Sequence, residues 1–134
     1  MESVMHSDMM DRVNQVCRPA RMQHVKNFEL PEDSININNG ALVLHLPHQS
    51  LCAVDINFGP NQGGIPVLFI SPQLHGTLIC SRYQDLKYGF SNGWSRFVRR
   101  ENFQANDMVQ LWSFADVNNN LYFAIYPQER SDSS

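Results

Sequence analysis

Residues 91–100 read Ser-Asn-Gly-Trp-Ser-Arg-Phe-Val-Arg-Arg, which is the strongest local pattern in the chain. Its large apolar residues are spaced as one face of a helix: Trp94, Phe97 and Val98. Ser91 or Asn92 is placed to cap the first turn. The stretch ends on two arginines, and positive charge at a helix C-terminus is favourable for the helix dipole. The pattern predicts a helix over 91–100 that buries its aromatic face.

Strand patterns lie on both sides of this helix. Apolar and β-branched residues over 65–70 and 77–83 predict two strands before it. After it, 108–114 and 121–126 alternate as strands, and the polar residues 116–120 between them predict a hairpin. The aromatic residues of this half are predicted to form the core, together with one valine: Trp94, Phe97, Val98, Trp112 and Phe114.

The chain before residue 65 has weaker patterns. A short helix is predicted over Arg21–Phe28. Alternating isoleucines over 35–38 and leucines over 42–46 predict two strands that flank a turn at Asn39-Gly40, and 54–58 predicts another strand. Many strands and two short helices predict a mostly-β fold, a barrel or sandwich with helices at its ends.

Length and composition favour one folded domain. A chain of 134 residues has room for a single domain over 1–134, with a core at about 4–127 and a disordered tail over 128–134. With 43% hydrophobic and 17% charged residues, it is too apolar for a disordered chain and too lightly charged for a coiled coil. No apolar run approaches the ~20 residues of a membrane helix, and no secretory signal is visible. The cysteines, Cys17, Cys52 and Cys80, are interpreted as core residues in a reducing compartment.

Basic residues are concentrated in two stretches although the net charge is -3. Residues 12–26 contain four basic residues and no acidic one, and residues 78–100 contain five against one acid. No Lys or Arg occurs from Asn27 to Ser81. If the two stretches meet in the fold, they form a positive face that can hold a polyanion. Chance clustering of charge in a small domain is the alternative.

Motifs for catalysis or metal binding are absent from the sequence. We find no nucleophile elbow, phosphate loop or zinc-protease motif. His45 and His48 are separated by Pro47 and fall short of the three or four ligands that a metal site needs. Ser7-Asp8 is interpreted as a cap or turn. The sequence therefore predicts a protein that is not an enzyme and has no cofactor and no metal.

The helix pattern and the residues after it resemble a known family. Gly93-Trp94 with Phe97-Val98, then Asn106-Asp107 and the strand 108–114, resemble the carboxyl half of the plant-specific B3 DNA-binding domain. The run 111–114 followed by 121–124 is similar to the divergent subgroup of mustard-family plants. Asn106 stands where the family has Gly, and Asn tolerates the left-handed backbone angles that such a turn needs. Nearer the start, Ser7-Asp8-Met9 and Arg18-Pro19 resemble the family's first segments.

The resemblance implies a fold and a function. It implies a seven-stranded open pseudobarrel with two short α-helices, in which two arms enter the major groove of double-stranded DNA. The arms correspond to about 7–21, after the first strand, and about 80–88, between the fourth and fifth strands. These ranges coincide with the two basic stretches. The expected function is sequence-specific DNA binding in a plant transcription regulator in the nucleus.

The residues expected to contact DNA come from these two arms. Arginine suits guanine, asparagine and glutamine suit adenine, and point charges suit phosphates. The candidates are Arg12, Asn14, Gln15, Arg18, Arg21, Lys26, Arg82, Tyr83, Gln84 and Lys87. Arg96, Arg99 and Arg100 stay ambiguous between helix electrostatics and phosphate contact. The alternative function is a B3-fold protein-interaction module that has lost strong DNA binding, with a protein partner or a second copy. Neither a membrane nor a small-molecule substrate is expected.

Overall fold

Strands make up most of the regular secondary structure. A computed structural model of the chain describes residues 2–36, 40–46, 64–83 and 87–128. In chain order the elements are α1 (Glu2–Val16), β1 (Arg21–Glu29), α2 (Glu32–Asn36), β2 (Leu42–His45), β3 (Ile65–Ile70), β4 (His75–Arg82), β5 (Lys87–Ser91), α3 (Trp94–Arg100), β6 (Met108–Ala115) and β7 (Leu121–Pro127). None of the helices in these ranges is long and apolar enough to cross a membrane.

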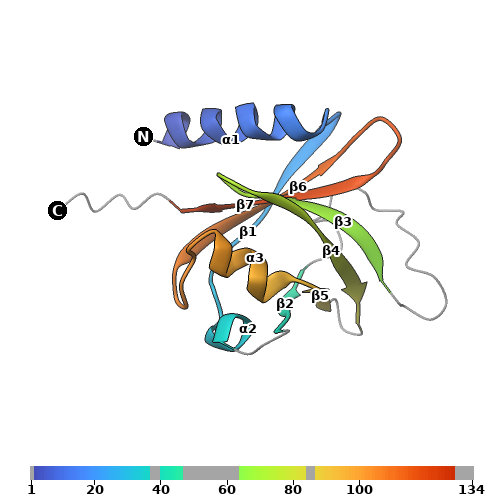
Figure 1. Cartoon of the computed structure of the whole chain (residues 1–134). Helices are drawn as coiled ribbons and strands as arrows, with labels where there is room; N and C mark the ends of the chain where they lie inside the picture. The colour runs from blue at the N-terminus through green and yellow to red at the C-terminus, as the bar shows by residue number, and fades with distance from the viewer. Residues whose placement is uncertain (1, 37–39, 47–63, 84–86, 129–134) are drawn as a thin grey trace.

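All seven strands belong to one curled sheet, with the order β1-β6-β7-β3-β4-β5-β2 (Figure 1). Neighbouring strands are antiparallel, except that β3 and β7 run parallel. The first and last strands of this order, β1 and β2, are the edges of the sheet. The predicted seven-stranded open pseudobarrel is confirmed. The described residues form three helices where two were expected.

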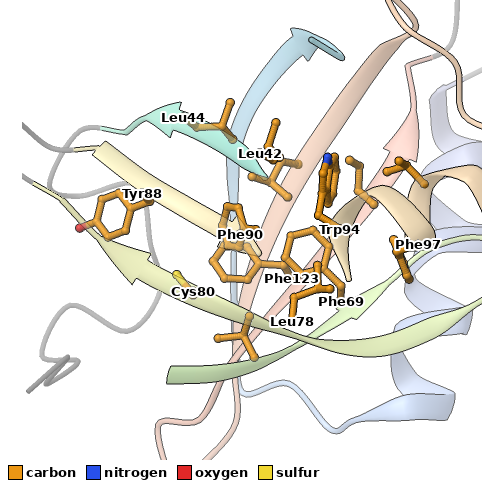
Figure 2. Packing of buried hydrophobic residues seen from close by; sticks show 14 of the residues in the cluster. Leu42, Leu44, Phe69, Leu78, Cys80, Tyr88, Phe90, Trp94, Phe97 and Phe123 are labelled. Atoms are coloured by element: carbon orange, nitrogen blue, oxygen red, sulfur yellow. The ribbon is translucent and has the colours of Figure 1, made fainter. Parts of the chain in front are cut away.

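The inner face of the sheet, towards α3, carries the main core. Side chains alternate along β6 and β7, so that Leu111 and Phe123 point inwards while Phe114 and Ala124 point to the other face. Phe69 lies at the centre of the inner cluster, with ring centroids 4.9 Å from Phe90 and 5.3 Å from Phe123. Figure 2 shows these rings beside Trp94 and Phe97, which α3 contributes. The predicted aromatic face of this helix is therefore confirmed.

Helix α1 covers the outer face of the sheet. Its buried residues are spaced four apart along one side: Met9, Val13 and Cys17, the last just past its end. They pack on outward-facing residues of β3, β6 and β7: Ile70, Phe114, Ala124 and Tyr126. Phe114 is buried in this outer cluster, whereas Trp112 packs against it and is only partly buried, so the prediction of Trp112 as a core residue was wrong. Packing on both faces stabilises a sheet that would otherwise expose apolar side chains.

The helix predicted over Arg21–Phe28 is wrong, because these residues form the edge strand β1. The strand pairs with β6, from Arg21 opposite Ala115 to Glu29 opposite Met108. The register shifts between His24 and Lys26, which marks a bulge. A helical spacing over seven or eight residues is a weak signal, and the hydrogen bonds offered by the edge of β6 outweigh it.

Two other local predictions also fail. Ile35 lies in helix α2 and is buried, so the strand expected over 35–38 does not begin there. The Ser34 hydroxyl donates to the Pro31 carbonyl at 2.8 Å, which favours a helical turn after the proline. Helix α3 begins at Trp94 after Gly93, with no side-chain cap, since Ser91 still pairs with Ile79 as a strand residue. The strand expected over 54–58 lies outside the described residues.

Burial of two thiols predicts that alkaline conditions weaken the fold. Burial raises the pKa of Cys17 from 9.0 to about 11 and that of Cys80 from 9.0 to about 12. The folded state therefore holds these protons more tightly than the unfolded chain, so the contribution to stability is complete below pH 9 and is lost progressively as the pH rises from 9 through 11 to 12. We expect the melting temperature to fall from about pH 8.5 to about pH 10.5, with a smaller fall in Cys80→Ala. An identical fall in the variant would contradict this assignment.

Candidate nucleic-acid interface

The strand register gathers basic residues at one end of the sheet, called here the hairpin end because the β6–β7 hairpin turns there. Arg21 begins β1 opposite Ala115, the residue from which β6 enters the hairpin. Across the sheet, β3 begins at this end, and Ile65 pairs with Cys80 near the end of β4. Arg82, the last residue of β4, is therefore at the hairpin end as well. In Figure 1 the hairpin and the start of β1 lie at the upper right, with the end of β4 below them.

The two arginines stand on different strands of the curled sheet. Four strand spacings separate β1 from β4, which is about 19 Å along the curved sheet. Arg21 and Arg82 are both exposed. Arg18, shortly before Arg21 in the chain, and Lys87, across the turn from Arg82, are exposed as well.

The β4–β5 connection holds an exposed aromatic side chain. The Tyr83 amide donates to the Lys87 carbonyl at 2.7 Å and closes the turn. Residues 84–86, including the candidate Gln84, lie outside the described residues. The Tyr83 side chain is 48% exposed and its ring lies against Gly89, where a Cβ atom would approach the ring to 2.7 Å. The glycine thus provides the space that seats this ring beside Arg82.

Gly89→Ala is expected to displace Tyr83 while leaving the fold intact. The added methyl group meets the end of an exposed side chain, which can swing into solvent. We expect NOEs between the Tyr83 ring and residue 89 to disappear in the variant. Although Gly89 is buried, the free energy of unfolding should change by less than about 1 kcal/mol, because alanine is favoured over glycine in a strand by about 0.5–1 kcal/mol and this offsets the lost ring contacts. Retention of the ring contacts, or a much larger loss of stability, would contradict this account of the glycine.

The β6–β7 hairpin is fixed by one carboxylate. Asp116 accepts hydrogen bonds from the backbone amides of Asn118 and Asn120, both at 2.9 Å. The Asn120 side chain and the Tyr122 hydroxyl also donate to it, each at 3.0 Å. The Asn120 contacts are the main reason why the pKa of Asp116 lies below its ordinary value of 3.8. Arg21 reaches this hairpin, and its guanidinium donates to the side-chain oxygen of Asn119.

Residues 7–21 do not form the expected arm. They lie in α1 as far as Val16, because the four-residue spacing of apolar side chains lets the helix pack on the sheet. Asn14 and Gln15 are exposed in the last turn of α1, whose end meets the start of β1 at the hairpin end (Figure 1). Lys26 is partly buried half-way along β1, opposite Leu111.

Arg12 is directed away from the hairpin end. Its Nε donates to the Ser71 carbonyl at 3.3 Å, and its Nη2 lies 3.4 Å from Nδ1 of His75. His75 starts β4, so about 23 Å of strand separates it from Arg82. The buried Ser71 hydroxyl also donates to the Glu101 carboxylate. Ser71, in the β3–β4 turn, thus contacts both Arg12 of α1 and the residue that follows α3. Of the basic residues in the first stretch, Arg12 therefore does not join Arg21 at the hairpin end.

Comparison with known proteins identifies the family. A sequence model of the B3 domain-containing protein At2g31720-like family matches residues 44–129, more than half of the chain. The chain belongs to this family. The B3 domain-containing protein At2g31420 of Arabidopsis thaliana is 35% identical over 48 residues, which cover 36% of this chain and 23% of that protein. The matched segment is thus less than a quarter of this relative's length.

A solved structure shows the same fold. The Arabidopsis FUS3-DNA complex superposes with a TM-score of 0.55 and covers 81% of this chain and 100% of that chain. The sequence identity is 16%, so this likeness concerns the architecture. This B3 chain keeps the expected connection between the fourth and fifth strands at the hairpin end. It carries helix α1 where the resemblance implied a strand and an arm.

The sequence did not point to Asn119, which contacts Arg21 at the hairpin end. Residues 116–120 are predicted only as a turn, because their composition is typical of a turn and does not indicate a contact with another segment. The sequence does contain a signal for a fixed turn, since Asp116 is followed by asparagine two and four residues later. Aspartate side chains accept hydrogen bonds from backbone amides a few residues ahead. The contact with Arg21 spans 98 positions of sequence, and only the pairing of β1 with β6 creates it.

The opposite end of the B3 sheet contains a groove. It has a volume of about 450 Å³, and its lining includes Pro72, Phe103, Pro127, Glu101 and Asp107. Its two carboxylates are engaged within the protein, Glu101 with Ser71 and Asp107 with the Gln104 amide at 2.9 Å. Among the described residues, no three His, Cys, Asp or Glu side chains are grouped to hold a metal ion. The basic residues at the hairpin end lie away from this groove.

Proposed function

We propose that this chain is one B3 domain over 1–134 that binds double-stranded DNA at the hairpin end and regulates transcription in the nucleus. The observation that carries the proposal is that Arg21 and Arg82, from the two basic stretches, stand at the same end of one sheet. Membership of the B3 family supports it, as does the shared fold with a protein solved in complex with DNA.

The two sides of the surface have different side chains. On the β1 side, Arg18 and Arg21 supply charge, and Asn14 and Gln15 supply amides that can pair with adenine edges. On the β4 side, Arg82 and Lys87 flank a turn that also exposes Tyr83. Phosphate contacts from the charged groups fix the position of the domain, and base contacts select the sequence. The proposal requires neither a cofactor nor a catalytic step.

A binding selection followed by a salt titration tests this proposal. Random double-stranded oligonucleotides are selected on the purified chain, and the affinity for the best sequence is measured by fluorescence anisotropy. If Arg18, Arg21, Arg82 and Lys87 each neutralise a phosphate, the affinity should fall about 100-fold between about 50 and 200 mM salt. Selection of no sequence, or an affinity that salt does not change, would overturn the proposal.

One observation favours a second function, that of a protein-interaction module. The segment expected to form the first arm is a helix packed on the sheet, and it exposes two acidic residues, Asp8 and Asp11. Negative charge there repels DNA and attracts a basic partner, which includes the basic hairpin end of a second copy. Sedimentation of the chain with and without DNA distinguishes the two. A dimer that Asp8→Asn/Asp11→Asn dissociates, together with absence of DNA binding, would establish the second function.

A further inference from the structure

The guanidinium of Arg21 is held by the β6–β7 hairpin. Arg21 is exposed at the first position of the edge strand β1, where a long side chain would otherwise sample many rotamers. Its Nη2 donates to the side-chain oxygen of Asn119. This hydrogen bond leaves the other guanidinium N–H groups able to donate outwards, because arginine carries about five. The contact therefore restricts the side chain without using up its charge or its fork of donors.

The hairpin is a firm support for this contact. Asp116 accepts four hydrogen bonds from Asn118, Asn120 and Tyr122, so the turn is fixed from within. The Asn119 amide donates to the Asp116 carbonyl at 3.0 Å. Asn119 has a φ of 66°, a left-handed conformation that asparagine tolerates better than most residues. Residue type and backbone angle together direct its side chain towards β1.

We infer that the β6–β7 hairpin supports the DNA-binding surface without touching DNA, because Asn119 is a positioning residue that orders Arg21 for a phosphate. The inference rests on the proposed function, which places Arg21 at the DNA backbone. A side chain ordered before binding loses less conformational freedom when it contacts DNA. Asn119 thus raises affinity through Arg21 and makes no contact with DNA of its own.

The decisive variant is Asn119→Gly, because glycine keeps the left-handed backbone while the side chain that contacts Arg21 is removed. We expect the affinity for the selected oligonucleotide to fall about 3- to 10-fold, the effect of leaving one long side chain unordered. The salt slope should stay unchanged, since Arg21 still reaches its phosphate. Asn119→Asp places a carboxylate against Arg21 and should reduce the salt slope by about one, as Arg21→Ala does.

Asn102→Gly is the matched control. Asn102 is also exposed and left-handed, with a φ of 67°, but it follows α3 at the opposite end of the sheet. This variant should bind DNA like the wild type. The pair Arg21→Ala/Asn119→Gly should bind no more weakly than Arg21→Ala alone, since Asn119 acts only through the arginine. In the DNA-free chain, NMR should show slowed rotation of the Arg21 guanidinium, and Asn119→Gly should abolish it.

The possible failures are distinguishable. If the wild-type chain binds no oligonucleotide, the proposed function fails and this inference fails with it. If the wild type binds and Asn119→Gly binds equally well, only the positioning role of Asn119 is overturned. A further loss from Asn119→Gly in the Arg21→Ala background would overturn it too, because it would show that Asn119 contacts DNA directly. Free rotation of the Arg21 guanidinium in the wild type would refute the ordering itself.

Discussion

Phe69→Ala is expected to lower the free energy of unfolding by about 3–5 kcal/mol, the range for removing a fully buried aromatic ring. Phe69 has no exposed surface. Its ring contacts four other rings, with centroids 4.9 to 6.1 Å away: those of Phe90, Trp94, Phe97 and Phe123. Because a domain of this size is stable by only about 5–15 kcal/mol, this loss removes a large part of its stability and should lower the midpoint of denaturation accordingly. Urea denaturation followed by circular dichroism measures the change.

Two further variants show whether the lost ring itself is responsible. Phe69→Leu keeps most of the volume and should lose less than half as much stability as Phe69→Ala. Val43→Ala changes a side chain that is 48% exposed and should stay within about 0.5 kcal/mol of the wild type. A loss below about 1 kcal/mol for Phe69→Ala would mean that this ring is not the centre of the core.

The variant Arg21→Gln/Arg82→Gln should weaken DNA binding about 100-fold at low salt. It removes one charge from each side of the proposed surface and keeps side chains of similar length. Loss of two charge-assisted contacts at about 1.5 kcal/mol each gives this magnitude. The salt slope should also decrease by about two, because two fewer counterions are released. Fluorescence anisotropy on the selected oligonucleotide measures both quantities.

The same change of charge elsewhere provides the control. Arg99→Gln/Arg100→Gln removes two exposed arginines from the last turn of α3, at the other end of the sheet. This variant should bind DNA within about threefold of the wild type and lose some helix stability, because positive charge there is favourable for the helix dipole. Equal losses in the two double variants would show that net charge, and not the hairpin end, governs binding.

The patterns that the sequence predicts well are those in which local spacing and burial agree. The helix at Trp94 and the β6–β7 hairpin have both a clear period and a matching tertiary environment, and both are present. Residues 21–28 carried a helical spacing, but their pairing with β6 joins segments far apart in the chain, which no local pattern contains. Helix α1 likewise depends on distant segments, because its apolar side chains need the outer face of the sheet to pack against.

The candidate site was predictable as two stretches of charge but not as a surface. The count of basic residues located Arg21 and Arg82, and the strand register places them at the same end of the sheet. Arg12 lies in the same basic stretch as Arg21, yet it binds the β3–β4 turn, because its position on α1 directs it there. Asn119 lies far from both stretches in sequence. Residue type predicted the chemistry, whereas the pairing of strands decided the geometry.

The bulge in β1 has a consequence for how the protein behaves at high concentration. An incomplete barrel leaves two strands with unpaired backbone groups, and such strands can recruit a second chain into a growing fibril. The shift between His24 and Lys26 interrupts the even row of donors and acceptors that an incoming strand would need. The arginine and lysine on the same strand add electrostatic repulsion between copies. The β1 border of the barrel is thereby protected against intermolecular strand addition.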